Sequence, residues 1–293
     1  MYNELSIRMK TFYEQIPKIK LIRRMPVIIR LDGKAFHTFT KGFKKPFDEI
    51  LIKTMQETTK YLCENIQGCV LGYTQSDEIS LLLVDYKKLN SDAWFDYEVQ
   101  KMCSIAASMV TMIFNKELIK NIKEYDIKCS SMIQYVELQK LHNDYIKELN
   151  KAVEKGAMFD AICFNIPKEE VTNYIYWRQL DASRNSVQMV GQANFSHKEL
   201  KNKSCNNIQD MLMIQKGINW NDFPVYQKRG TCVIKEEYFI NDKGEEIEND
   251  FIINKSVENI TMRTRWFIDK NIPLFKGEDR NYVEKLFNFE SKK

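Results

Sequence analysis

Two acidic residues lie next to apolar runs in positions that suit a metal site. Asp32 comes directly after the apolar run 27–31, and Asp77 shortly before the run 79–83. If both runs are strands, each carboxylate lies on a rigid element at the rim of a sheet. Carboxylate oxygens at one rim are hard ligands of the kind that Mg²⁺ accepts, and such an ion usually also holds nucleotide phosphates. The candidate chemistry therefore depends on whether Asp32 and Asp77 meet in space.

The residues around these acids favour phosphate chemistry over acid–base chemistry on sugars. Gly33 allows a ligand to approach the backbone closely and offers a carbonyl oxygen, and Ser76 adds a hydroxyl group. A basic loop beside a metal site suits a triphosphate. Four lysines follow Asp32 within thirteen residues: Lys34, Lys41, Lys44 and Lys45. The alternative interpretation is that both acids are turn or strand-end residues without a ligand.

The order of predicted elements brings the two acids together. The pattern predicts strands at 27–31, 69–73, 78–84 and 159–164, helices at 47–66 and 94–119, and an extra helix at 128–154. This is the β-α-β-β-α-β order of a ferredoxin-like fold of the α+β class. Right-handed crossovers place the first strand antiparallel to the third, so Asp32 is expected beside Asp77 and Glu78.

The rest of the chain predicts further helices and a late hairpin. Residues 1–25 are expected to form an amphipathic helix and a basic connection, and helices are expected at 169–190 and 208–216. Strands at 231–240 and 246–253 are expected to pair through a turn at 241–244. We expect one catalytic domain, 1–240, and a C-terminal extension, 241–293, packed against it.

Composition narrows the class of protein. The 293 residues include 44% hydrophobic residues, enough for a sizeable core, and a net charge of +4 that permits a nucleic-acid partner. Seven scattered cysteines and three histidines argue against a zinc site and a secreted disulfide scaffold. We find no signal pattern and no uninterrupted apolar run near ~18 residues, so no membrane is expected. We expect a reduced, cytoplasmic protein, with a mitochondrial location left open for a eukaryotic source. His142, on the charged helix 128–154, is expected to face solvent.

Two basic groups are candidates for RNA contact. Arg178 and Arg184 lie three residues either side of Asp181, which predicts either an internal ion-pair ladder or a substrate-facing cluster. Lys228 and Arg229 end a Pro- and Gly-bounded segment with an aromatic residue, which suits a phosphate backbone or an ordinary solvated loop.

Several of these segments together resemble the tRNA-histidine guanylyltransferase family and its guanylyltransferase-like relatives, which extend RNA in the 3′-to-5′ direction. The resemblance covers most of residues 5–235, and the first and third segments are specific in combination. The matching segments are Arg30-Leu31-Asp32-Gly33-Lys34-Ala35-Phe36-His37, Lys45-Pro46-Phe47-Asp48, Gly72-Tyr73-Thr74-Gln75-Ser76-Asp77-Glu78-Ile79-Ser80, Phe159-Asp160-Ala161, Tyr176-Trp177-Arg178-Gln179-Leu180-Asp181 and Lys228-Arg229-Gly230.

The resemblance implies a fold, a reaction and a set of site residues. It implies a polymerase-like palm, two Mg²⁺ ions held by the Asp32 and Asp77 side chains and the Gly33 carbonyl, and a less defined catalytic role for Glu78. It implies activation of the 5′-monophosphate of a tRNA with ATP, then attack by the 3′-hydroxyl of an incoming GTP or other nucleotide. Relatives of this type are typically tetramers. Nucleotide contacts are expected at Lys34, His37, Lys45, Asp48, Ser76 and Lys101.

One departure from the family pattern bears on the substrate. Eukaryotic members that act on histidine tRNA carry His-Ile-Asn-Asn-Leu-Tyr-Asn after the Trp-Arg-Gln segment, whereas this chain has residues 183–189 of different sequence and keeps only Asn185. We therefore expect templated repair of 5′-truncated tRNA, with Asn185 a candidate RNA contact. Addition of the extra 5′ guanylate to histidine tRNA is the alternative. A non-catalytic RNA-binding protein is the alternative of another class, and a nucleotide cyclase is disfavoured because the turn 75–78 lacks glycines.

Overall fold

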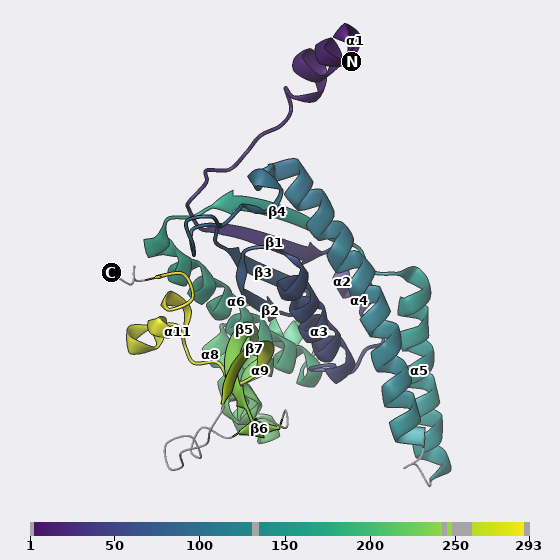
Figure 1. Ribbon diagram of the computed structural model, residues 1–293. Coiled ribbons are helices and arrows are strands. Elements are labelled where there is room, and N and C mark those ends of the chain that lie inside the picture. Colours follow the sequence, from purple (N-terminus) through teal and green to yellow (C-terminus); the bar gives the residue numbers. More distant parts are fainter. Residues whose placement is uncertain (1–2, 131–134, 242–244, 248–259, 290–293) are drawn as a thin grey trace.

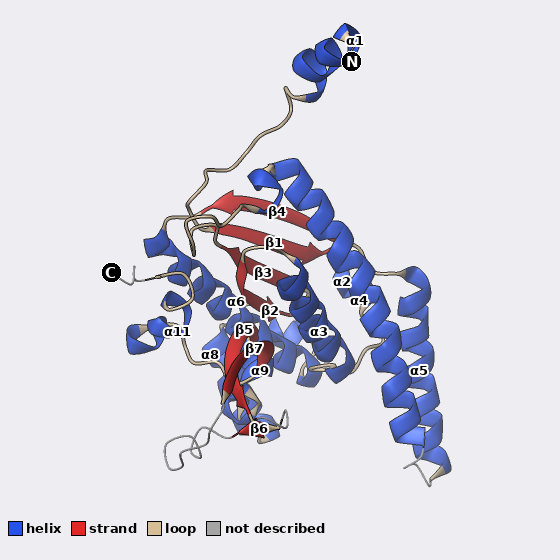
Figure 2. Cartoon of the chain, in the orientation of Figure 1, coloured by secondary structure: helices blue, strands red, loops and turns tan. Residues whose placement is uncertain are grey.

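The computed structural model describes residues 3–130, 135–241, 245–247 and 260–289, and shows a mixed α and β chain built on one antiparallel sheet (Figures 1 and 2). The strands follow the order β4-β1-β3-β2-β5-β6, and β7 also pairs with β5. Their bounds are β1 Val27–Gly33, β2 Cys69–Gln75, β3 Glu78–Leu83, β4 Phe159–Asn165, β5 Thr231–Ile240, β6 Glu246–Ile247 and β7 Thr261–Asp269.

The predicted neighbourhood of the first and third strands is confirmed. β1 lies between β3 and β4 and is antiparallel to both, with Asp32 opposite Glu78 on one side and Asp160 on the other. Helices cover both faces of the sheet, so the β1 residues Ile28, Ile29 and Leu31 are completely buried. The end of β1 that carries Asp32 is therefore held in place by paired backbone on both sides.

One face of the sheet is covered by helices α3 (Glu49–Asn65) and α4 (Val99–Ser130), and the short helix α2 (Phe36–Phe39) lies beside them. The expected helix boundaries were wrong here. A 3₁₀ turn at Trp94–Tyr97 precedes α4, which continues past residue 119. Helix α5 (Val136–Lys155) therefore starts later than residue 128, and Figure 1 shows that it runs back along α4 beyond the sheet.

The packing of α5 on α4 also corrects the expectation for His142. Its side chain is buried, and its Nε2 atom lies 2.7 Å from the Asp126 carboxylate on α4. Helix α4 contains an 18-residue window apolar enough to cross a membrane, but a core helix passes the same test. Helix α4 packs along α3, β4 and α5, which buries part of its apolar residues.

The other face of the sheet is covered by α6 (Lys168–Asn194) and by the C-terminal residues, where Phe275, Val283 and Phe287 are buried. The expected late hairpin is confirmed for the described residues, because Glu246 and Ile247 of β6 pair with Ile240 and Phe239 of β5. Positions 248–253 of the expected strand lie outside the described residues, and β5 also has a long partner that was not expected, β7. Shorter helices complete this side: α7 His197–Leu200, α8 Cys205–Lys216, α9 Val225–Arg229 and α11 Asn281–Glu284.

The N-terminal segment stands away from the body of the molecule (Figure 1). Helix α1 (Glu4–Met9) continues into a π-helical turn at Lys10–Glu14, and none of these residues is buried. The segment joins the body from Ile19 onward, where the Leu21 amide donates to the Tyr97 carbonyl, the Val99 amide donates to the Ile19 carbonyl, and Lys20 pairs with Asp96.

Candidate active site

The two acids of the predicted site lie at one rim of the sheet. The Gly33 amide, directly after Asp32, donates a hydrogen bond to the Asp77 carbonyl at 3.1 Å. Asp77 itself occupies the tight turn between β2 and β3, where the preceding Ser76 has a φ of 50°. The left-handed conformation of Ser76 is uncommon for a residue with a side chain and often marks a functional turn. The prediction that the two acid-bearing segments meet is confirmed.

The electrostatics of this rim fit a bound cation. Burial raises the pKa of Asp77, the charge of Asp32 raises it further, and a hydrogen bond from Ser76 acts in the opposite direction. Within the described part of the chain, no basic side chain pairs with Asp77, and no group of three His, Cys, Asp or Glu residues converges on one point. The ligands that the chain offers to a cation at this rim are therefore the two aspartate carboxylates and the Gly33 carbonyl. This set fits Mg²⁺, which binds through one or two carboxylates together with water and substrate phosphates.

Glu78 differs from the two aspartates because it is already paired. Its Oε1 atom lies 2.8 Å from the Arg178 Nε atom, although neither atom makes an aligned hydrogen bond. Its Oε2 atom lies 3.6 Å from the Arg30 Nε atom. Burial raises the pKa of Glu78, and the two arginines oppose that effect. We therefore read Glu78 as the centre of an ion-pair network beside the rim.

Arg30 is the member of this network that sequence reasoning missed. Its guanidinium donates to Asp32 Oδ2 at 3.0 Å and also approaches Glu78, so it links the two acids. The signal was present in the sequence, because residues two apart on a strand point to the same face. Asp160, on β4 opposite Asp32, adds a third acid to this end of the sheet.

The arginines of α6 divide between the interior and the surface. Arg178 is buried and also donates to Asp181 at 2.6 Å, which matches the internal ion-pair alternative. Arg184 is 63% exposed and donates to the same carboxylate at 2.5 Å. Asn185 is 3.4 Å from Asp181. Of these candidates for RNA contact, only Arg184 presents its charge to solvent.

The second basic pair, Lys228 and Arg229, also has one buried member and one that is more accessible. Lys228 is buried, its ammonium donates to the Asn221 carbonyl at 2.5 Å, and burial lowers its pKa. Arg229 is half-buried, and its carbonyl accepts a hydrogen bond from the Tyr73 hydroxyl. Lys228 therefore has a structural place in the loop before β5.

The residues expected to bind a triphosphate lie largely on the loop after β1. Lys34, His37 and Lys45 are exposed, and the Lys34 amide is fixed by the Met158 carbonyl at 2.9 Å. Lys101, in contrast, lies near the start of α4 with its ammonium over the Phe95 ring. At the start of α4, the carbonyl of Val99 contacts the thiol of Cys163. Cys163 pairs with Ile29, which lies about 10 Å along strand β1 from Asp32. Contact of Lys101 with the nucleotide stays a prediction.

Asp48 organises the lysine loop. Its carboxylate accepts hydrogen bonds from the Ile50 and Leu51 amides at the start of α3, from the Lys44 amide, and from the Tyr145 hydroxyl at 2.6 Å. It is 5% exposed, so its two oxygens are occupied within the protein. In nucleotide binding, Asp48 would therefore act by positioning the lysine loop and the start of α3.

The ammonium of Lys44 lies between two aromatic rings, 4.8 Å from the centre of Tyr125 and 4.4 Å from that of Tyr145. Helices α4 and α5 supply these rings, so the extra helix α5 fixes one lysine of the loop.

A cleft beside the acid-bearing turn brings several predicted residues together. Asp48, Ser76 and Asn185 line it with Tyr226 and Gly230, so α3, the turn and α6 share one concave surface. A Cβ atom at Gly230 would lie 2.6 Å from the Thr74 carbonyl oxygen, and this residue has a φ of +83°. Glycine is therefore required where the loop passes under the turn.

The fold and the site define a nucleotidyltransferase, and comparisons with known proteins agree. A family model described as tRNAHis guanylyltransferase matches residues 6–167. The chain belongs to this family.

Two solved structures are similar over nearly the whole chain. A bacterial tRNA(His) guanylyltransferase-like protein in complex with ATP is 40% identical, covers 97% of this chain and 99% of its own, and has a TM-score of 0.72. A bacterial guanylyltransferase-like protein in complex with GTP is 38% identical, covers 98% and 100%, and has a TM-score of 0.70. The tRNA(His) guanylyltransferase of Saccharomyces cerevisiae is 25% identical over 72% of this chain and 82% of its own.

Proposed function

We propose that this chain is a Mg²⁺-dependent 3′-to-5′ RNA nucleotidyltransferase that adds nucleotides to the 5′ end of tRNA. The observation that carries the proposal is the hydrogen-bonded meeting of the Asp32 and Asp77 segments at one rim. Strands β4-β1-β3-β2 with α3 and α4 would then form a ferredoxin-like, polymerase-type palm. The ATP and GTP complexes of the bacterial relatives support nucleoside triphosphates as substrates.

In this mechanism the chain mainly positions charge. Asp32, Asp77 and the Gly33 carbonyl would hold two magnesium ions, which when bound neutralise charge on the reacting oxygens. Lys34 and Lys45, exposed on the loop after β1, would bind the triphosphate, and Ser76 would donate a hydrogen bond. The tRNA 5′-monophosphate attacks ATP and becomes adenylylated, which releases pyrophosphate. The 3′-hydroxyl of the incoming nucleotide then attacks the activated 5′ phosphorus and displaces AMP.

Two substrates are consistent with the family. The loss of the eukaryotic signature at 183–189 favours templated repair of 5′-truncated tRNA. The names of the relatives favour addition of guanylate to histidine tRNA as the second candidate. Assembly as a homotetramer belongs to the same proposal, and large apolar side chains exposed along the N-terminal segment support it, among them Phe12, Tyr13 and Ile16.

The test is a 5′-end extension assay on labelled, monophosphorylated tRNAs that lack one 5′ nucleotide, with and without a complementary partner base. Asp32→Ala and Asp77→Ala should abolish addition and keep the melting temperature near that of the parent chain. Asp144→Ala, a distant exposed carboxylate, is the matched control.

Lys45→Ala should weaken use of the triphosphate more than binding of tRNA. Normal turnover by either aspartate variant would refute the assignment, and extension of full-length histidine tRNA alone would select the second candidate.

A further inference from the structure

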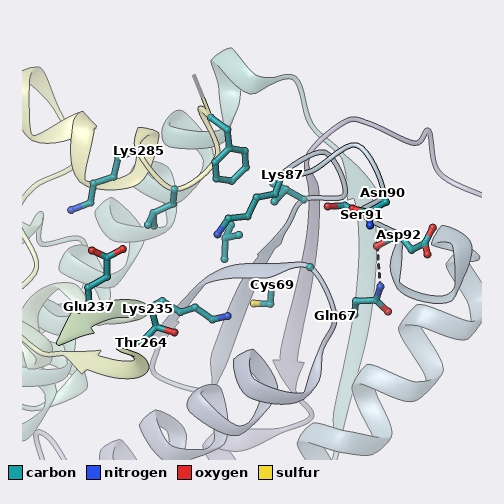
Figure 3. Close-up of a pocket in the computed structure, with 15 residues that line it drawn as sticks. Gln67, Cys69, Lys87, Asn90, Ser91, Asp92, Lys235, Glu237, Thr264 and Lys285 are labelled. Carbon is teal, nitrogen blue, oxygen red and sulfur yellow. Dashed lines mark hydrogen bonds between the residues drawn. The ribbon is translucent and has the colours of Figure 1, made fainter. Parts of the chain in front are cut away.

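A pocket lies at the end of the sheet away from Asp32 and Asp77 (Figure 3). Strand β3 begins beside Asp77 and ends at Leu83, and the pocket residue Val84 follows. Seven residue steps of strand separate Asp77 from Val84, which is about 23 Å. The pocket is therefore a separate site from the rim that carries the two acids.

The pocket exists because the sheet divides. β2 pairs with β5 only between Leu71–Ile234 and Thr74–Thr231, and β2 has an irregularity at Val70. Strand β7 pairs with β5 from Cys232 to Ile240, whereas the pairing of β5 with β2 ends at Ile234. Lys235, the next residue of β5, therefore faces an opening where a continued ladder would have placed Val70.

Three lysines from three parts of the chain line this opening: Lys87 after β3, Lys235 on β5 and Lys285 after α11. Each ammonium lies over an aromatic ring at 5.1 to 5.5 Å, and none forms an ion pair within the part of the chain that the structure describes. Figure 3 shows Lys87 and Lys235 extending between Lys285 and Glu237 on one side and Gln67 on the other.

The acids of the pocket do not cancel this charge. Asp92 lies 3.6 Å from the guanidinium of Arg23, which also pairs with Asp85 and Asp96. Glu237 is the other carboxylate of the lining, so three cations face two acids. Such an excess in a concave, partly apolar surface attracts an anionic ligand.

The other lining groups narrow the chemistry of that ligand. Phe289 and Leu286 form an apolar wall, and the Lys87 ammonium lies 5.5 Å from the centre of the Phe289 ring. Gln67 and Asn90 offer amide groups on the opposite side, where Gln67 donates to the Asp92 carbonyl at 3.2 Å. Cations, an aromatic ring and amides together match the phosphate, base face and base edge of a nucleotide unit.

We propose that this pocket is a second binding site for a phosphate-bearing nucleotide unit, remote from the reacting end. Two sources have this chemistry, a free nucleotide and a residue of an RNA chain. That an RNA is at hand rests on the proposed function, in which a tRNA is the substrate. In that case the lysines add affinity and hold the RNA without taking part in the reaction.

The test measures binding without turnover. A 5′-phosphorylated hexaribonucleotide and ATP are titrated into the full chain, into Lys87→Ala/Lys235→Ala, and into Lys216→Ala. Lys216 is the matched control, because its ammonium also lies over a ring, that of Phe195, and it is outside the pocket. Melting temperatures check that all three proteins are folded.

We expect the double variant to bind the hexaribonucleotide roughly tenfold more weakly, with the slope of log affinity against log salt reduced by about 1.4. ATP binding should be unchanged if RNA is the source, whereas loss of one equivalent of bound ATP would identify a free nucleotide. The inference is overturned if the double variant binds both probes like the Lys216→Ala control. That result would leave the proposed function intact, and full activity of Asp77→Ala would remove the function without changing this binding measurement.

Discussion

The hydroxyl of Tyr145 offers a sharp test of how the inserted helix α5 supports the lysine loop. In Tyr145→Phe the Asp48 carboxylate loses one of its four donors, the hydroxyl at 2.6 Å, and keeps the three backbone amides. A hydrogen bond to a charged group contributes about 1.5–3 kcal/mol. Because the amides remain, we expect a loss of about 1.5 kcal/mol, which lowers the melting temperature by roughly 3 °C in a chain of this size.

The assay is thermal unfolding of Tyr145→Phe, Tyr145→Leu and the control Tyr135→Phe, whose ring is 72% exposed. Phenylalanine keeps the ring under the Lys44 ammonium, so the leucine variant should lose about 0.5–1 kcal/mol more. In the extension assay Tyr145→Phe should raise the KM for triphosphate more than it lowers kcat. A melting temperature equal to that of the Tyr135 control would refute the idea that Tyr145 holds Asp48.

Two further predictions concern packing and pH. Gly72→Ala would place a Cβ atom 2.6 Å from Cys63 Sγ and should lower the free energy of unfolding by about 1–3 kcal/mol, measured by chemical unfolding. Adding Cys63→Ala to the same chain should recover part of that loss, and strictly additive effects of the two substitutions would contradict the explanation. Burial lowers the pKa of Lys228 below its ordinary 10.5. The folded state therefore releases this proton first, so its contribution to stability rises with pH up to about 10.5, and Lys228→Met should remove that rise; equal pH slopes in both proteins would refute it.

The central sheet could be predicted from the sequence because its signals are local. The apolar runs at 27–31 and 79–83 are short and bounded by charged or turn residues, and crossover handedness then fixes their order. The meeting of Asp32 and Asp77 follows from that order. The pairing of Glu78 with Arg178 could not be derived, because it depends on the placement of α6 almost a hundred residues later.

The remaining errors have physical causes as well. The apolar residues of α4 repeat at helical spacing across position 119 without interruption, so the sequence shows no end there. The sequence does not predict strand β7, because six of its nine residues, Thr261–Arg265 and Phe267, are exposed, so little apolar alternation marks it. Asp48 stays a predicted nucleotide contact; an acid directly before a helix is also a good N-cap, and the structure shows that second role.

The detached N-terminal segment has a consequence for how the protein is degraded. No side chain of α1 or of the π-helical turn after it is buried. A helix as short as α1 is only marginally stable by itself in water. Opening it breaks no contact of the sheet. A protease acting on the single chain can therefore cleave after Lys18 without any unfolding of the strands, whereas assembly through the exposed apolar side chains of this segment would protect the same bond.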